Sequence, residues 1–126
     1  MTLPSTISDS SDSLSVFGLQ KQIDDWCTSV GVRYFNEMTN LAQLMEEVGE
    51  LSRIISRTYG QQSWKDGESA YNLADEMADV LFVLVCLANQ TGVDLTKAIE
   101  RNIAKKTQRD ATRHQNNPKL KPDHPS

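Results

Sequence analysis

Apolar residues recur at three- and four-residue intervals through most of the chain, which is the spacing of one face of an α-helix. Four such segments predict helices at about 15–29, 36–59, 69–91 and 94–113. No segment shows the alternation of apolar and polar residues that is typical of a strand. Gly31, Gly60 and Gly92 follow the first three segments as expected stops, and Asp94 is a suitable N-cap for the fourth.

The apolar positions of each segment predict its core-facing side. The first segment offers Val16, Leu19, Ile23, Trp26 and Cys27, and the second offers Leu41, Leu44, Met45, Val48, Leu51 and Ile55. Four helices with short connections predict an all-α fold, an antiparallel four-helix bundle. We expect the folded domain to cover residues 14–114, between a flexible leader at 1–13 and a flexible tail at 115–126.

The composition limits the class of function. The 126 residues suffice for one domain, and the net charge of −4 argues against binding to polymeric nucleic acid or to an anionic membrane. The longest apolar run is far shorter than the roughly 18 residues of a membrane span. Cys27 and Cys86 lie in apolar helical stretches, so we expect reduced core thiols. Without a visible secretory signal, a cytoplasmic protein is expected.

The second helix carries three acidic residues, Glu46, Glu47 and Glu50. Glu47 and Glu50 are one turn apart and separated by about 60° around the helix axis. They lie away from the main apolar stripe, so a solvated face explains them as well as a functional site does. However, Ile54 falls between them in angle, so this face is not purely polar.

The third helix gives a stronger indication, because it is apolar from Met77 to Ala88 except at Asp79. A helix that is apolar all round is buried on most sides, and a lone buried carboxylate is costly unless it is paired or binds a metal. Glu76 lies one turn earlier on the same side. If the second and third helices pack antiparallel, the two acidic pairs face each other. The alternative is a salt bridge to a lysine or arginine of a neighbouring helix.

Four converging carboxylates repel one another, and a hard divalent cation removes that repulsion. Oxygen-only ligands favour magnesium, manganese or calcium over zinc. Magnesium keeps some of its waters and accepts phosphate oxygens, so such a site suits phosphate chemistry.

The fourth helix changes character along its inward side. Leu95 and Ile99 begin that side, and helical spacing continues it through Asn102, Lys106, Arg109 and Arg113. A cationic stripe opposite the carboxylates would suit a polyphosphate. Complementing the helix dipole is the alternative explanation, above all for Arg113, whereas the inward direction of Asn102, Lys106 and Arg109 suggests a polar cleft.

The paired motifs resemble the EExxE…ExxD signature of MazG-like nucleotide pyrophosphohydrolases. Here the signature reads Glu46-Glu47-Val-Gly-Glu50 and then Glu76-Met-Ala-Asp79, and the last helix, VDLTKAIERNIAKKTQRD, is also similar to the family's. The resemblance covers about residues 36–113. It implies an all-α NTP pyrophosphatase fold, a homodimer or homotetramer, and hydrolysis of a nucleoside triphosphate to the monophosphate and pyrophosphate.

The resemblance also implies roles for individual residues. Mg²⁺, with Mn²⁺ as a substitute, would be held by Glu47, Glu50, Glu76 and Asp79. Water would attack the α-phosphorus, and Glu46 either orients or deprotonates that water or faces solvent. Lys106 and Arg109 would hold the β and γ phosphates, with Asn102 beside them on the inward side. The preferred base is left open.

Two other readings compete with this one. A di-iron or di-manganese bundle normally needs Glu-x-x-His pairs, and the second and third helices contain no histidine. A non-catalytic helical module that binds a metal, a nucleotide or another protein would carry the same carboxylates as a solvated or inter-subunit face.

Overall fold

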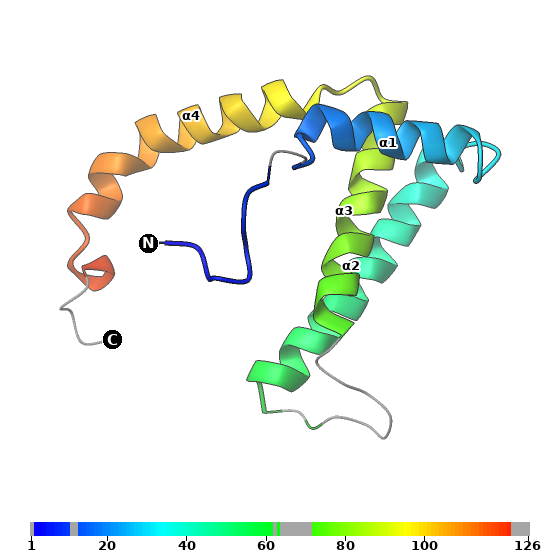
Figure 1. Cartoon of the computed structure of the whole chain (residues 1–126). Coiled ribbons are helices and arrows are strands. Elements are labelled where there is room, and N and C mark those ends of the chain that lie inside the picture. Colours follow the sequence, from blue (N-terminus) through cyan, green and yellow to red (C-terminus); the bar gives the residue numbers. More distant parts are fainter. Residues whose placement is uncertain (1, 11–12, 62, 64–71, 122–126) are drawn as a thin grey trace. The chain divides into compact units, whose positions relative to one another are not determined.

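The structure is a computed structural model that describes residues 2–10, 13–61, 63 and 72–121 (Figure 1). The described residues form helices and no strand, so the all-α prediction is confirmed. The elements are α1 (Val16–Thr28), α2 (Glu37–Tyr59), α3 (Leu73–Gln90), α4 (Leu95–Gln115) and the short 3-10 helix η2 (Pro118–Leu120). The chain divides into two compact units, residues 1–93 and 94–126, and each is described by itself.

Three of the helices begin at a side-chain cap. Ser15, Asn36 and Asp94 each accept a hydrogen bond from the backbone N–H three residues further on, at 2.8–3.2 Å. Such caps satisfy a backbone donor that has no partner inside the helix. These starts agree with the predicted starts to within one residue. The predicted start of the third helix near residue 69 lies outside the described residues, and α3 is described from Leu73 onward.

The expected glycine stops act in two different ways. Gly92 has a φ of 72°, the left-handed conformation that glycine adopts without strain, directly after the end of α3. Gly60 is the C-cap of α2 with φ −93°, and a Cβ there would lie 2.4 Å from the carbonyl oxygen of Ser56. Gly60 is therefore required by close backbone approach rather than by a left-handed turn.

Helices α2 and α3 pack side by side and antiparallel (Figure 1). The Nδ2 of Asn40, near the start of α2, donates to the Oε1 of Gln90, at the end of α3, over 2.8 Å. Asn40 and Ile54 are buried on the α3-facing side of α2, with Glu47 midway between them. Residues seven apart lie on nearly one line along a helix, so this line runs along the contact with α3.

Only part of the apolar stripe predicted for α2 packs within this unit. Two of its residues, Leu44 and Leu51, are partly buried and lie close in angle to the line through Asn40 and Ile54. The other four lie about 80° to 160° around the helix from that line and are between 37% and 63% exposed: Leu41, Met45, Val48 and Ile55. The prediction is wrong for these four positions, because it assigned the whole stripe to the contact within the chain. Met77, Leu81 and Leu84 of α3 are also about half exposed.

Helix α1 packs on α3 through apolar side chains. The rings of Trp26 and Phe82 meet edge to face with their centroids 5.5 Å apart. Cys27 and Cys86 are both buried and free, and their predicted place in the core is confirmed. Among the described residues no single helix is both long enough and apolar enough to span a membrane.

Candidate metal centre

Three of the four predicted carboxylates come together between α2 and α3. Glu47, Glu76 and Asp79 each offer one oxygen, and these three oxygens lie within 4.8 Å of one another. Glu47 reaches this position because it lies on the α3-facing line of α2, between buried Asn40 and buried Ile54. Glu76 and Asp79 share one side of α3 because they are one turn apart. Antiparallel packing then brings the two helices' carboxylates together.

Burial differs among the three carboxylates. Glu47 and Glu76 are partly buried, whereas Asp79 is exposed. One oxygen of Glu76, Oε2, has no contact with solvent and no hydrogen-bond partner among the described residues. A buried carboxylate oxygen without a partner is costly. The burial argument that the sequence attached to Asp79 therefore belongs to Glu76, because α3 is not buried on all sides within this unit.

The surroundings of Glu47 within the cluster disfavour its ionised form. Burial raises the pKa of Glu47, and the neighbouring charges of Asp79 and Glu76 raise it further. Each ionised neighbour makes the next ionisation harder, because like charges meet in a partly desolvated space. A cation in this space would relieve both the repulsion and the unpartnered oxygen of Glu76.

The donor set fits a hard divalent cation. All three donors are carboxylate oxygens, as magnesium, manganese and calcium prefer. Bonds of about 2.1 Å to an octahedral magnesium ion put adjacent ligands about 3.0 Å apart and opposite ligands about 4.2 Å apart. Oxygens that lie within 4.8 Å of one another would therefore move closer by up to about 1.8 Å to enclose such an ion. Three protein ligands would leave coordination positions for waters or phosphate oxygens.

Glu50 and Glu46 lie outside this group of three oxygens. One oxygen of the exposed Glu50, Oε2, accepts from two nitrogens of Arg53, Nη2 at 2.7 Å and Nε at 3.2 Å. Glu50 is still close enough for its charge to raise the pKa of Glu47. Glu46 is exposed on α2 beside Glu47. The metal-binding role of Glu50 and the helper role of Glu46 remain predictions.

The basic residues predicted to contact phosphate lie on α4, in the second unit. Asn102, Lys106 and Arg109 are all exposed. The Arg109 guanidinium donates to both carboxylate oxygens of Asp110, at 2.8 and 2.9 Å, and this pair raises the pKa of Arg109. Their expected place opposite the carboxylates remains a prediction.

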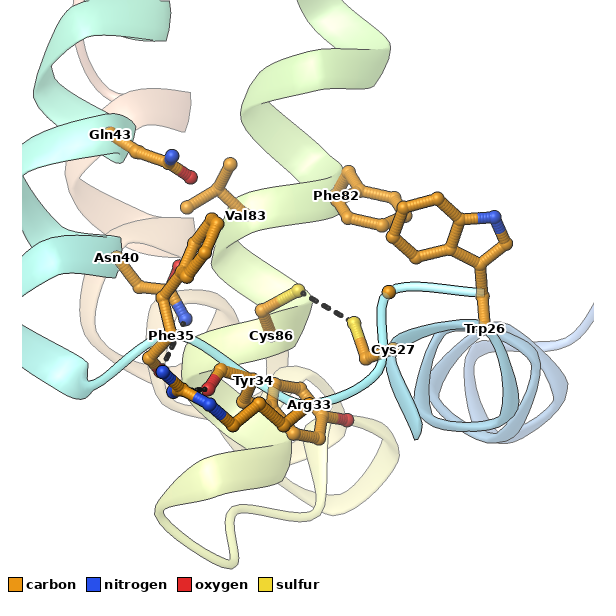
Figure 2. Close-up of a pocket in the computed structure, with 11 residues that line it drawn as sticks. Trp26, Cys27, Arg33, Tyr34, Phe35, Asn40, Gln43, Phe82, Val83 and Cys86 are labelled. Carbon is orange, nitrogen blue, oxygen red and sulfur yellow. Dashed lines mark hydrogen bonds between the residues drawn. The ribbon is translucent and has the colours of Figure 1, made fainter. Parts of the chain in front are cut away.

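Figure 2 shows a pocket, missed in the sequence analysis, that is lined by residues of α1, α2, α3 and the loop between α1 and α2. Its cavity volume is about 150 Å³, and its lining includes four aromatic residues, Trp26, Tyr34, Phe35 and Phe82. Gln43 and Val83 also line it. Gln43 lies one turn before Glu47 on α2, and Val83 lies one turn after Asp79 on α3, so the pocket begins one helical turn from the cluster.

Hydrogen bonds hold the loop between α1 and α2 against this pocket. The Tyr34 hydroxyl donates to the Oδ1 of Asp24 at 2.6 Å and accepts from the Nδ2 of Asn89 at 3.0 Å. Burial and the bond to Asp24 raise the pKa of Tyr34, so it stays protonated. The amides of Asn40 and Gln90 both donate to the carbonyl oxygen of Phe35. The loop is therefore tied to α1, α2 and α3.

The sequence of this chain is similar to a known protein family and to a protein of known sequence. Residues 35–114 match the family model of the MazG nucleotide pyrophosphohydrolase domain. The uncharacterised protein YpjD of Bacillus subtilis (strain 168) is 37% identical over 95 residues, which cover 75% of this chain and 86% of YpjD.

The solved structures that are similar to this one include two described as pyrophosphatases of this kind. The crystal structure of Bacillus subtilis YpjD, described as a candidate pyrophosphatase, superposes with a TM-score of 0.68 at 36% identity, covering 80% of this chain and all of that one. A Bacillus-conserved MazG protein, a nucleotide pyrophosphohydrolase, superposes with a TM-score of 0.66 at 30% identity, covering 79% of this chain and 96% of that one.

Because neighbouring charges repel Glu47, the substitution Glu47→Gln should change the thermal stability of the protein. The pKa of Glu47 is higher in the folded state than in the unfolded state, so ionisation of Glu47 disfavours folding. Its contribution to stability is therefore fully present at low pH, where Glu47 is protonated, and is lost as pH rises through the folded-state pKa. In EDTA at pH 7 the variant should therefore melt a few degrees above the wild type, and the gap should close as pH falls. Mg²⁺ should raise the Tm of the wild type but not that of the variant.

Differential scanning calorimetry at several pH values measures this. Glu100→Gln, an exposed site on α4, is the matched control and should leave both the Tm and its response to Mg²⁺ unchanged. A Glu47→Gln protein that melts below the wild type in EDTA at pH 7 would contradict the account.

Proposed function

The chain belongs to the MazG nucleotide pyrophosphohydrolase family, and from this we propose that it hydrolyses a nucleoside or deoxynucleoside triphosphate to the monophosphate and pyrophosphate with the help of Mg²⁺. One observation carries the proposal: a three-carboxylate cluster lies one helical turn from a pocket lined by aromatic side chains. A metal-held phosphate and a neighbouring flat, apolar group are the two halves of a nucleotide.

We assign Glu47, Glu76 and Asp79 to hold Mg²⁺, for which Mn²⁺ would substitute. Glu50 would be the fourth ligand, with its carboxylate released from Arg53. The exposure of this ion pair supports the exchange, because a surface ion pair contributes only about 0–1 kcal/mol and is easily broken. Mg²⁺, when bound, would neutralise phosphate charge and lower the pKa of the attacking water.

The residues of the chain supply orientation and proton transfer. Water attacks the α-phosphorus, the bond to the oxygen bridging the α and β phosphates breaks, and pyrophosphate leaves. Glu46 lies about 100° around α2 from Glu47, and we assign it to orient the water or accept its proton. Asn102, Lys106 and Arg109 would hold the β and γ phosphates, with a phosphate oxygen replacing Asp110 as the partner of Arg109.

The aromatic pocket would hold the nucleoside. One turn of a helix rises about 5.4 Å, which is close to the span of the sugar between a base and its α-phosphate. A base between Phe35 and Phe82 would bury apolar surface, and the Gln43 amide could bond to its edge. A polar group placed in an apolar pocket confers selectivity, because a base that fails to bond leaves it unpaired.

The exposed apolar residues of α2 and α3 support a homo-oligomer. Met38, Leu41, Met45, Val48, Ile55 and Tyr59 follow the spacing of a coiled-coil seam along α2. We propose that this seam, which is defined by these six residues, packs against a second copy of the chain in a homodimer or homotetramer. Two free cysteines fit a reducing compartment, and we place the enzyme in the cytoplasm.

Removing a metal ligand should abolish the reaction. Asp79→Asn and Glu76→Gln should each lower kcat/KM for pyrophosphate release by about 100-fold or more, because each takes a charged oxygen from the cation. Pyrophosphate is measured over a panel of canonical and modified triphosphates with Mg²⁺ or with EDTA. Glu100→Gln is the control, and circular dichroism checks that every variant is folded. Wild-type protein that binds nucleotides without releasing pyrophosphate would instead support the non-catalytic module.

Substitution of Gln43, whose amide lines the pocket, should alter the selectivity among bases more than it alters kcat. Gln43→Leu should raise KM for the preferred nucleotide about fivefold and reduce the differences in KM among bases, because one hydrogen bond contributes about 1 kcal/mol. Its kcat should change less. Gln22→Leu, at an exposed position of α1, is the matched control. Equal effects of the two substitutions would remove Gln43 from base recognition.

A charge in the seam should separate the subunits. Met45→Glu is tolerated by an isolated chain, in which Met45 is 63% exposed, but would bury an unpaired charge between copies. Light scattering after size exclusion should give the mass of one chain for Met45→Glu and a multiple of it for the wild type. Val30→Glu, at an equally exposed apolar position outside the seam, should not change the mass. A monomeric wild type would contradict the proposed assembly.

A further inference from the structure

Two buried thiols that have no part in the proposed hydrolysis meet at the boundary between α1 and α3. The Sγ atoms of Cys27 and Cys86 lie 3.6 Å apart, and both residues line the aromatic pocket (Figure 2). The two cysteines are 59 positions apart in the sequence, on different helices. Figure 2 shows both side chains pointing toward each other across the line that marks this contact.

A disulfide bond is within reach of this arrangement. The bond length is about 2.05 Å, so the sulfur atoms must approach by only about 1.6 Å. Side-chain rotation can supply most of that movement, since both residues border a cavity of about 150 Å³ rather than a filled core. The pocket also gives a small oxidant access to the sulfur atoms.

We propose that Cys27 and Cys86 form an oxidation-sensitive thiol pair that closes to an intramolecular disulfide and fastens α1 to α3 beside the aromatic pocket. A bond here would add to a described contact between these helices that includes the Trp26–Phe82 ring pair and hydrogen bonds between Gln20 and Asn89, near the end of α3. A disulfide that closes a long loop stabilises the fold chiefly by restricting the unfolded chain.

The oxidation balances with a peroxide as the oxidant. The sulfur of one cysteine attacks a peroxide oxygen of hydrogen peroxide, the O–O bond breaks, one water leaves and a sulfenic acid remains. The sulfur of the second cysteine then displaces the hydroxyl group, which leaves as a second water with the thiol proton. Two thiols have lost two electrons and one peroxide has gained them.

The buried setting keeps the pair reduced until an oxidant is present. Burial raises the pKa of Cys86 to about 12, and its contact with Cys27 adds to the shift. The thiolate is the reactive form, so oxidation by low peroxide concentrations should be slow. Such a pair responds to sustained oxidative conditions rather than to brief ones.

The position of the disulfide also predicts an effect on nucleotide binding. This effect, unlike the disulfide itself, rests on the proposed function. Drawing Cys27 toward Cys86 moves one wall of the pocket that we assign to the nucleoside. Oxidised enzyme should therefore show a changed KM, with the carboxylate cluster and its response to Mg²⁺ retained. Thiol counts and thermal stability test the disulfide without reference to catalysis.

The experiment compares reduced and peroxide-treated protein. In the wild type both thiols should disappear together, the mass should fall by that of two hydrogen atoms, and the protein should run as a single chain on a non-reducing denaturing gel. Its Tm should rise on the order of 10 °C, and dithiothreitol should reverse every change. Cys27→Ser and Cys86→Ser should show no reversible rise in Tm. Cys27→Ala serves as a second variant if serine prevents folding.

Three results would overturn the proposal. The first is a wild type that still has two titratable thiols after a peroxide treatment that oxidises the remaining cysteine of Cys27→Ser and of Cys86→Ser. The second is oxidation that yields only disulfide-linked pairs of chains. The third is a disulfide that forms but lowers the Tm. A normal disulfide in a protein without pyrophosphatase activity would leave this proposal intact and reject only the proposed function.

Discussion

The antiparallel contact between α2 and α3 is the constraint on which the candidate centre depends. Asn40 and Ile54 are buried in this contact, and Glu47 lies midway between them on the same line of α2. The packing free energy of the apolar residues holds Glu47 against Glu76 and Asp79 despite their repulsion. The cost appears in two places: a raised pKa at Glu47 and a buried, unpartnered oxygen at Glu76.

The same contact joins the cluster to the aromatic pocket. Since Gln43 and Val83 are each one turn from a carboxylate, the register that assembles the cluster also sets its distance from the pocket. The loop carrying Tyr34 and Phe35 lines the pocket, and side-chain amides of α2 and α3 donate hydrogen bonds to it. A slip of one turn between α2 and α3 would therefore disrupt both halves of the proposed nucleotide site together.

Much of this arrangement could be predicted from local sequence. The helix starts at Ser15, Asn36 and Asp94 are encoded by cap residues, and helical spacing alone puts Glu76 and Asp79 on one side of α3. These features depend on neighbours within about four residues, so no tertiary information is needed to find them. The MazG family was likewise indicated by the two acidic motifs and is confirmed by the comparisons.

The rest depends on contacts between distant residues. Helix α2 has two lines of residues that could pack against α3. The more apolar line, through Leu41 and Met45, is not the one that packs within the chain. Glu50 bonds to Arg53 rather than joining the three oxygens, a choice between partners that spacing leaves open. The Cys27–Cys86 contact spans 59 positions, and no local pattern signals it.

The central claim is that the α2–α3 contact holds carboxylates for a divalent cation. An anomalous difference map from crystals grown with Mn²⁺ tests it most directly, because manganese scatters anomalously and takes the same oxygen ligands as magnesium. The account predicts a peak within bonding distance of Glu47, Glu76 and Asp79. Well-ordered crystals at saturating Mn²⁺ that show these three side chains without a peak between them would contradict it.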